Sequence, residues 1–175
     1  AADALFRDAP ARLIELFALA PKHDADVHPR TLPRGARALA PLAFETRDDT
    51  QANQLFLEIL TSRKNSERVL RLMNESGVFG RFLPDFGRIV AMMQFDMYHS
   101  YTVDEHTLKA IGILHGIETG ALRQAAPVAT EAMPEIGSRR ALYVAMLLHD
   151  IAKGRSGDHS VWVPRWHWRF ARVWV

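Results

Sequence analysis

The chain has 175 residues, 48% hydrophobic and 24% charged, the balance of an ordinary globular protein with room for one domain or one domain plus a smaller helical piece. Its 22 basic and 20 acidic residues nearly cancel, so the charge gives no strong case for nucleic-acid binding. Because the chain contains no cysteine, a disulfide framework, a thiolate nucleophile and a cysteine-based zinc site are excluded, and any metal must be bound by His, Asp, Glu or water.

The sequence shows neither a signal peptide nor an apolar run of the ~20 residues that span a bilayer. It begins at Ala1 and enters helix-like sequence within a few residues, so we expect the chain to be an excised piece of a longer protein. There is no internal repeat, and no segment alternates between apolar and polar residues long enough to form a sheet. The sequence therefore predicts an all-α fold.

The N-terminal region predicts a helix followed by a loop. Asp8 and Pro10 are typical of a helix start, and the apolar residues after them recur at helical spacing until Pro21. Residues 21–35 contain three prolines and a glycine, which indicates a loop.

Two further helices are predicted, one capped by Thr50 and one that begins at Ser66 and ends before Gly77. Residues 80–97 indicate a turn followed by a helix, with Asp85 and Asp96 as surface or capping groups. The helices that start near Thr50 and at Ser66 each carry an apolar stripe that we interpret as a core face. The stripe of the helix at Thr50 consists of Leu55, Phe56, Ile59 and Leu60, and that of the helix at Ser66 of Val69, Leu70 and Met73.

Thr102, followed three residues later by Glu105, has the pattern of a capping box that starts another helix. His106 lies in the first turn of this helix, on its predicted apolar face. A lone His on such a face is usually a core residue with its hydrogen bonds satisfied, but His106 has a candidate partner in His149 at the end of another core helix. Residues 116–138 indicate a helix end and a loop. The inward face of the helix that starts at Thr102 is predicted to carry Val103, His106, Ala110, Leu114 and Ile117.

The apolar run 141–148, capped by Ser138, predicts a buried helix that ends in His149 and Asp150. Gly154 suits the left-handed turn that closes many helices. An ionised Asp is rarely buried unless it is paired or bound to a metal. Consecutive helical side chains point about 100° apart, so both residues can reach one ion only from an ending turn. The alternative is an ordinary helix C-terminus, where His is favourable beside the negative end of the dipole.

These motifs resemble the HD superfamily of metal-dependent phosphohydrolases, and more closely the HD domain of the bacterial GlnD family of bifunctional uridylyltransferase and uridylyl-removing enzymes. Residues 1 to about 80 are similar, more weakly, to the helical linker that joins the nucleotidyltransferase domain of that family to its HD domain, although Pro33 and Gly35 depart from it. Residues 81–160 would then be the N-terminal part of the HD domain. The stretches that carry the resemblance are Phe86-Gly87-Arg88-Ile89-Val90, Tyr101-Thr102-Val103-Asp104-Glu105-His106-Thr107-Leu108, and His149-Asp150-Ile151-Ala152-Lys153-Gly154-Arg155 through Gly157-Asp158-His159-Ser160.

The resemblance implies hydrolysis of the UMP–tyrosine phosphodiester on uridylylated PII, a nitrogen-signalling protein, in the cytoplasm and without a nucleic-acid or membrane partner. It implies that His106, His149 and Asp150 bind a divalent metal, with Mg or Mn favoured by the family and Fe or Zn compatible with imidazole and carboxylate ligands. Lys153 is a catalytic candidate that places its ammonium on a phosphate oxygen, or else a lysine that complements a helix dipole. His159 is a further ligand or the general acid for the leaving tyrosinate, or else a polar loop residue.

The sequence also leaves other functions open. HD sites need a later Asp from a downstream helix to complete the metal shell, and no Asp follows Asp158. We therefore expect poor metal affinity and little hydrolase activity from this chain alone, without the nucleotidyltransferase and regulatory domains of such an enzyme. The main alternative function is a non-catalytic helical module that couples neighbouring domains.

Residues 161–175 differ from the family pattern, because they contain all four tryptophans, three arginines and no acidic residue. One interpretation is an interfacial segment that binds anionic lipid, but Pro164 and the lack of a clear helical face argue against it. Written in GC-rich codons and preceded by one added cytosine, the stretch 162–170 reads Leu-Gly-Ala-Glu-Val-Ala-Leu-Ala-Leu, a helix of the kind that the family shows. We therefore hypothesise that the loss of one nucleotide after Val161 shifted the reading frame.

The nucleotide sequence of the gene around codon 161 tests this frameshift hypothesis. We expect a single-base insertion after that codon to restore a long open reading frame. A gene in which no such insertion restores the frame would contradict it.

Overall fold

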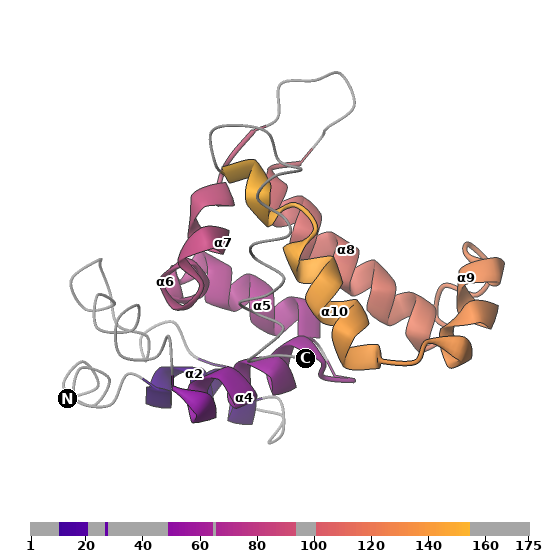
Figure 1. Ribbon diagram of the computed structural model, residues 1–175, viewed down its shortest axis with the longest axis horizontal. Coiled ribbons are helices and arrows are strands. Elements are labelled where there is room, and N and C mark those ends of the chain that lie inside the picture. Colours follow the sequence, from indigo (N-terminus) through magenta and orange to yellow (C-terminus); the bar gives the residue numbers. More distant parts are fainter. Residues whose placement is uncertain (1–10, 21–26, 28–48, 65, 94–100, 155–175) are drawn as a thin grey trace.

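The computed structural model describes residues 11–20, 27, 49–64, 66–93 and 101–154, and these form helices and turns without any strand (Figure 1). The all-α prediction is therefore confirmed. In chain order the elements are α2 (Ala11–Leu19), α4 (Thr50–Leu60), α5 (Ser66–Glu75), α6 (Val78–Phe82), α7 (Pro84–Ile89), α8 (Val103–Glu118), α9 (Pro127–Ala132), the 3-10 turn η3 (Met133–Glu135), α10 (Arg139–Leu148) and the 3-10 turn η4 (Ile151–Gly154). None of the helices in these ranges has the length and apolar character of a membrane span.

Helices α2 and α4 pack against each other through the apolar stripes that the sequence predicts. Ile14 and Phe17 from α2 and Phe56 and Leu60 from α4 are fully buried. The predicted helix start at 8–10 lies outside the described residues, as does most of the predicted loop at 21–35.

The cap of α4 is Asp49, and the prediction that Thr50 caps it is wrong by one residue. Asp49 has extended backbone angles, and its Oδ1 accepts hydrogen bonds from the backbone N–H groups of Gln51 at 2.8 Å and Ala52 at 3.0 Å. A carboxylate at this position satisfies two free N–H groups and places negative charge at the positive end of the helix dipole. Thr50 is instead the first helical residue.

Three phenylalanines join α4 to the short helices α6 and α7. The rings of Phe79 and Phe86 are stacked with their centroids 3.9 Å apart, and the centroid of Phe56 lies 5.4 Å from that of Phe79. This approach requires Gly80 and Gly87, because a Cβ atom on Gly87 would lie 2.6 Å from the Gly80 carbonyl oxygen. Two glycines therefore allow α6 and α7 to pack backbone against backbone.

Within residues 80–97, predicted as a turn followed by a helix, the first residues belong to the end of α6 instead of a turn, and the predicted helix is α7. Pro84 begins α7, because proline cannot continue α6. Asp85, which was expected at the surface or as a helix cap, is buried in the structure. It is only 8% exposed, with its Oδ1 3.7 Å from Arg88 Nε. Asp96 lies outside the described residues.

Helix α10 runs back along α8, so that the end of α10 lies near the start of α8 (Figure 1). The predicted cap of α10 is confirmed, since Ser138 Oγ accepts a hydrogen bond from the Ala141 N–H at 3.2 Å. The region 116–138, predicted as a helix end and a loop, also contains α9 and η3. Pro127 begins α9, where its missing N–H has no helical partner to lose.

An ion pair with a tyrosine partner fastens α10 to α8 at the end where α10 begins. The Arg139 guanidinium donates to both carboxylate oxygens of Glu118, through Nη2 at 2.9 Å and through Nε, and to the Thr61 carbonyl after α4 at 2.6 Å. Tyr143, fully buried, donates its hydroxyl to Glu118 Oε2 at 2.7 Å. The hydrogen bonds from Arg139 hold the pKa of Glu118 below its usual value.

Glu118→Gln is expected to lower the free energy of unfolding by about 2 kcal/mol at pH 7, because hydrogen bonds to a charged group are replaced by weaker ones to an amide. The pKa of Glu118 is lower in the folded state than in the unfolded state. Its contribution to the free energy of unfolding is therefore fully present above the unfolded-state pKa of about 4.3 and is lost as the pH falls through the folded-state pKa. The difference between wild type and variant should therefore shrink on acidification, measured by urea unfolding at pH 7 and pH 3.5.

The exposed Glu131 in α9 provides the matched control, and Glu131→Gln should leave stability nearly unchanged at both pH values. Equal effects of the two substitutions would contradict a fastening role for Glu118.

Candidate metal centre

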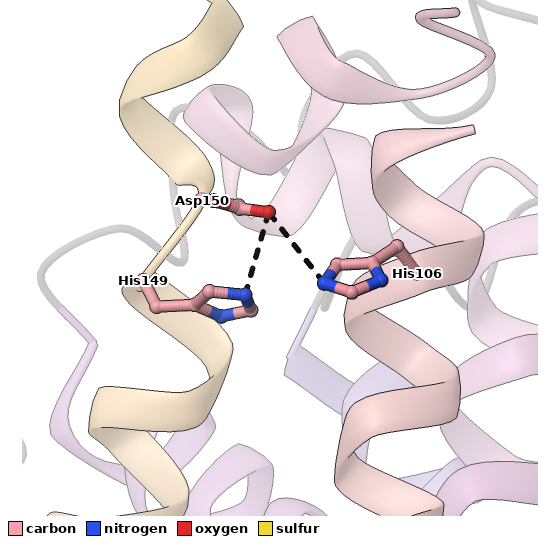
Figure 2. A group of neighbouring side chains, drawn as sticks. All are labelled: His106, His149 and Asp150. Carbon is pink, nitrogen blue, oxygen red and sulfur yellow. Dashed lines mark ion pairs between the residues drawn. The ribbon is translucent and has the colours of Figure 1, made fainter. Parts of the chain in front are cut away.

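Two imidazoles and one carboxylate meet where the start of α8 approaches the end of α10 (Figure 2). The candidate ligand atoms of His106, His149 and Asp150 all lie within 4.8 Å of one another. Asp150 Oδ2 is 3.3 Å from His149 Nε2 and 3.8 Å from His106 Nε2, and the two ring centroids are 5.6 Å apart. The structure therefore brings together the three side chains that the sequence singled out as metal ligands.

The end of α10 explains how two consecutive residues reach the same point. The α-helix ends at Leu148, His149 is its C-terminal cap, and the chain turns at Asp150 into η4. His149 still has helical backbone angles, φ −57° and ψ −35°, so the two side chains converge where the α-helix passes into the 3-10 turn. Figure 2 shows both directed toward His106 on α8.

The predicted left-handed turn at Gly154 is wrong. In the described part of the chain, the glycines with positive φ are Gly77 and Gly120. Gly154 instead permits close packing of η4 on α7, because a Cβ atom there would lie 2.8 Å from Arg88 Cβ and 3.0 Å from Ile89 Cγ2. The absence of a side chain at Gly154 thus allows the segment after Asp150 to pack closely on α7.

The start of α8 also differs from its prediction. Thr102 is at the cap position with extended backbone angles, but its side chain makes no capping hydrogen bond. Glu105, which would complete the capping box, instead forms an ion pair with Arg71 of α5, which also binds Glu67 at 2.8 Å. A full charge from the neighbouring helix replaces the local capping partner.

His106 lies at the edge of the core, and the prediction that it points inward is wrong. Its side chain is 45% exposed, and Ala110 and Ile117 on the same predicted face are only partly buried. The buried residues of α8 are Val103, Asp104, Thr107, Leu108, Ile111 and Leu114. An imidazole at this boundary can be reached from solvent, which a core histidine cannot.

Asp104 is a supporting residue that the sequence reasoning missed. It is 4% exposed, and its carboxylate accepts hydrogen bonds from Asn74 Nδ2 of α5 at 2.8 Å and from the Ala91 N–H at 3.2 Å. Ala91 has a φ of 56°, so the chain after α7 turns sharply there. Asp104 therefore fixes the first turn of α8, two residues before His106. The sequence feature that could have indicated this role is the pair of acidic residues in the first turn of α8, Asp104 and Glu105.

The hydrogen bonds of His149 leave a suitable nitrogen for a metal. Its Nδ1 lies 2.6 Å from the Met146 carbonyl oxygen. Since a carbonyl only accepts, Nδ1 carries the proton and Nε2, which faces Asp150, presents a lone pair when the ring is neutral. The hydrogen bond with Asp150 raises the pKa of His149, so a proton competes with a metal for this nitrogen.

Asp150 is ionised and already has a cationic partner. Burial raises its pKa, but hydrogen bonds from His149 and Lys153 outweigh the effect of burial and hold the pKa of Asp150 well below its usual range. Lys153 Nζ donates to Asp150 Oδ2 at 2.8 Å, and its side chain is 23% exposed. The structure thus places Lys153 at the cluster.

Besides His106 and His149, His115 is the histidine that the described part of the chain contains. It lies nine residues after His106 on α8, with its Nδ1 4.0 Å from Glu118 Oε2. His159 lies outside the described residues, as does the segment 161–175.

Comparisons with known proteins support the resemblance to bifunctional uridylyltransferase/uridylyl-removing enzymes. Residues 1–82 match the family model described as "Uridylyltransferase GlnD third domain". The chain is 57% identical over 159 residues to the bifunctional uridylyltransferase/uridylyl-removing enzyme of Azospirillum brasilense, 58% over 156 residues to that of Rhodospirillum rubrum, and 56% over 160 residues to that of Novosphingobium aromaticivorans. No solved structure matches the chain.

These matches cover 91%, 89% and 91% of the chain, but the chain spans only 17% or 18% of the length of each relative. The chain is therefore closely similar to one segment of the bifunctional uridylyltransferase/uridylyl-removing enzymes.

Proposed function

We propose that this chain is part of a metal-dependent HD phosphohydrolase, and that the complete enzyme removes UMP from a tyrosine of uridylylated PII in the cytoplasm. Residues 1–80 would form the helical linker, and residues 81–160 the first part of the HD domain. The observation that carries the proposal is the convergence of His106, His149 and Asp150 from two helices. The name of the similar enzymes, which includes uridylyl removal, supports the direction of the reaction.

The donor set suits a divalent cation. Two imidazoles and one carboxylate without a thiolate fit Mn, Fe or Zn, and the family resemblance favours Mg or Mn. His106 and His149 would offer nitrogen atoms and Asp150 an oxygen atom. A divalent cation bound there supplies an acidic water and offsets charge on a phosphoryl group.

The other residues of the site have roles in binding and proton transfer in this proposal. Lys153 brings a point charge to the cluster, where it can meet a phosphoryl oxygen. His159 would be a further ligand or would protonate the leaving tyrosinate. The partners of the chain are then uridylylated PII and the nucleotidyltransferase and regulatory domains of the parent enzyme.

One observation favours the alternative of a non-catalytic helical module that couples neighbouring domains. Asp150 is paired without a metal ion, because Lys153 and His149 both lie within 3.3 Å of its Oδ2. A buried carboxylate that is already paired needs no metal to be stable. Metal binding therefore separates the two functions.

The first test is titration of the chain with Mn²⁺ by isothermal calorimetry. We expect weak binding that falls about tenfold or more in His106→Ala and in His149→Ala, because each substitution removes one of the three ligands. His115→Ala is the matched control and should bind Mn²⁺ as the wild type does. Equal loss in all three variants, or no loss in His106→Ala, would contradict the proposed centre.

The second test is phosphodiester hydrolysis. We expect little or no turnover of uridylylated PII, or of a generic aryl phosphodiester, by the chain alone, because three protein ligands leave the metal shell incomplete. A chain whose reading frame is restored after Val161 is the matched comparison and should be more active. Turnover by the present chain at a rate near that of a complete enzyme would refute this expectation.

A further inference from the structure

An exposed aromatic ring lies beside the first turns of α8 and is held there by a lysine. Lys109 Nζ donates a hydrogen bond to the Tyr101 hydroxyl at 2.6 Å, and the same ammonium lies 4.2 Å from the centroid of the Tyr101 ring. Tyr101 is 47% exposed and precedes α8 by two residues. The ring is therefore held in place while much of its surface remains open to solvent.

The Tyr101–Lys109 pair is close to the candidate metal centre. Lys109 follows His106 by three residues on α8, and side chains at this spacing are neighbours with Cβ atoms about 5–6 Å apart. His106 and Lys109 both lie outside the buried face of α8. Because a helical side chain leans toward the N-terminus of its helix, the Lys109 side chain extends toward the turn of His106. The lysine thus links the ring to the helix turn that carries His106.

The charges around the centre favour an anionic ligand on this side. Lys153 lies against Asp150, and Lys109 is exposed on the neighbouring turn of α8. The acidic residue nearest in sequence, Glu105, is paired with Arg71 and therefore does not neutralise Lys109. A phosphoryl group at the centre would thus have Lys109 of α8 on one side and Lys153 of η4, which is paired with Asp150, on the other.

We propose that Tyr101 is the platform on which the base of a nucleoside 5′-phosphoryl substrate stacks, with Lys109 fixing the orientation of the ring. This inference rests on the proposed function, which places the phosphoryl group at the metal centre. The ammonium of Lys109 lies over one face of the ring, so the opposite face is the one that receives a base. Every base has a π-face, so this contact recognises the presence of a base and not its identity.

The test compares UMP with ribose 5-phosphate, which has the same phosphate and sugar but no base. Both are titrated by calorimetry into the full 175-residue chain with Mn²⁺ present. We expect UMP to bind at least fivefold more tightly, the ratio that corresponds to about 1 kcal/mol of stacking. In Tyr101→Ala and Tyr101→Leu the ratio should fall to about one, whereas Tyr101→Phe keeps the ring and should keep most of the ratio.

Two controls make the comparison specific. Lys64→Ala removes an exposed lysine near Thr61, at the end of α10 remote from the centre, and should leave both affinities unchanged. All variants share the tryptophans of residues 161–175, so any base binding by that segment is equal in each. Because Tyr101 is exposed, its variants should have the far-ultraviolet circular dichroism of the wild type.

The outcomes separate the two proposals. A wild-type chain that binds Mn²⁺ but binds both ligands equally, or that keeps its preference for UMP in Tyr101→Ala, overturns the stacking role and leaves the metal centre intact. A chain that binds neither ligand also overturns it. Failure of Mn²⁺ binding, measured before either ligand is added, is the result that removes the proposed function itself.

Discussion

The packing of α10 along α8 is the constraint on which the candidate centre depends. At one end, Arg139 binds Glu118 and Tyr143 completes the contact; at the other end, His106 and His149 face each other. A ten-residue helix is about 15 Å long and nearly rigid, so fastening its start fixes the direction in which its end approaches α8. The ion pair and the cluster are thus two ends of one helix contact.

Helices α5 and α7, which precede α8 in the chain, hold the two helix ends that carry the cluster residues. Helix α5 holds the first turn of α8 through Arg71 and Asn74, which bind Glu105 and Asp104. Helix α7 receives η4, and the missing side chain of Gly154 allows that approach. Each of the two ligand-bearing turns is therefore held by a different helix from an earlier part of the chain.

The charges of the cluster are compatible with both candidate functions, the metal-dependent hydrolase and the non-catalytic helical module. The carboxylate of Asp150 is stabilised by Lys153 and by His149, and the same interactions that lower its pKa compete with a cation for its oxygen atoms. A metal must compete with a proton for His149 and with Lys153 for the carboxylate of Asp150. The three side chains thus do not require a metal ion to be stable where they lie.

The sequence by itself determined the longer helices, because apolar spacing and a cap such as Ser138 are local properties of the chain, and its resemblance to the HD superfamily singled out the three candidate ligands. Only the tertiary structure decided that the rings meet and that His106 lies at the edge of the core, since these depend on how α8 and α10 cross. The predicted capping box failed because Glu105 forms an ion pair with Arg71, a residue distant in sequence, and Thr102 makes no capping hydrogen bond. The role of Gly154 likewise depends on a helix from another part of the chain.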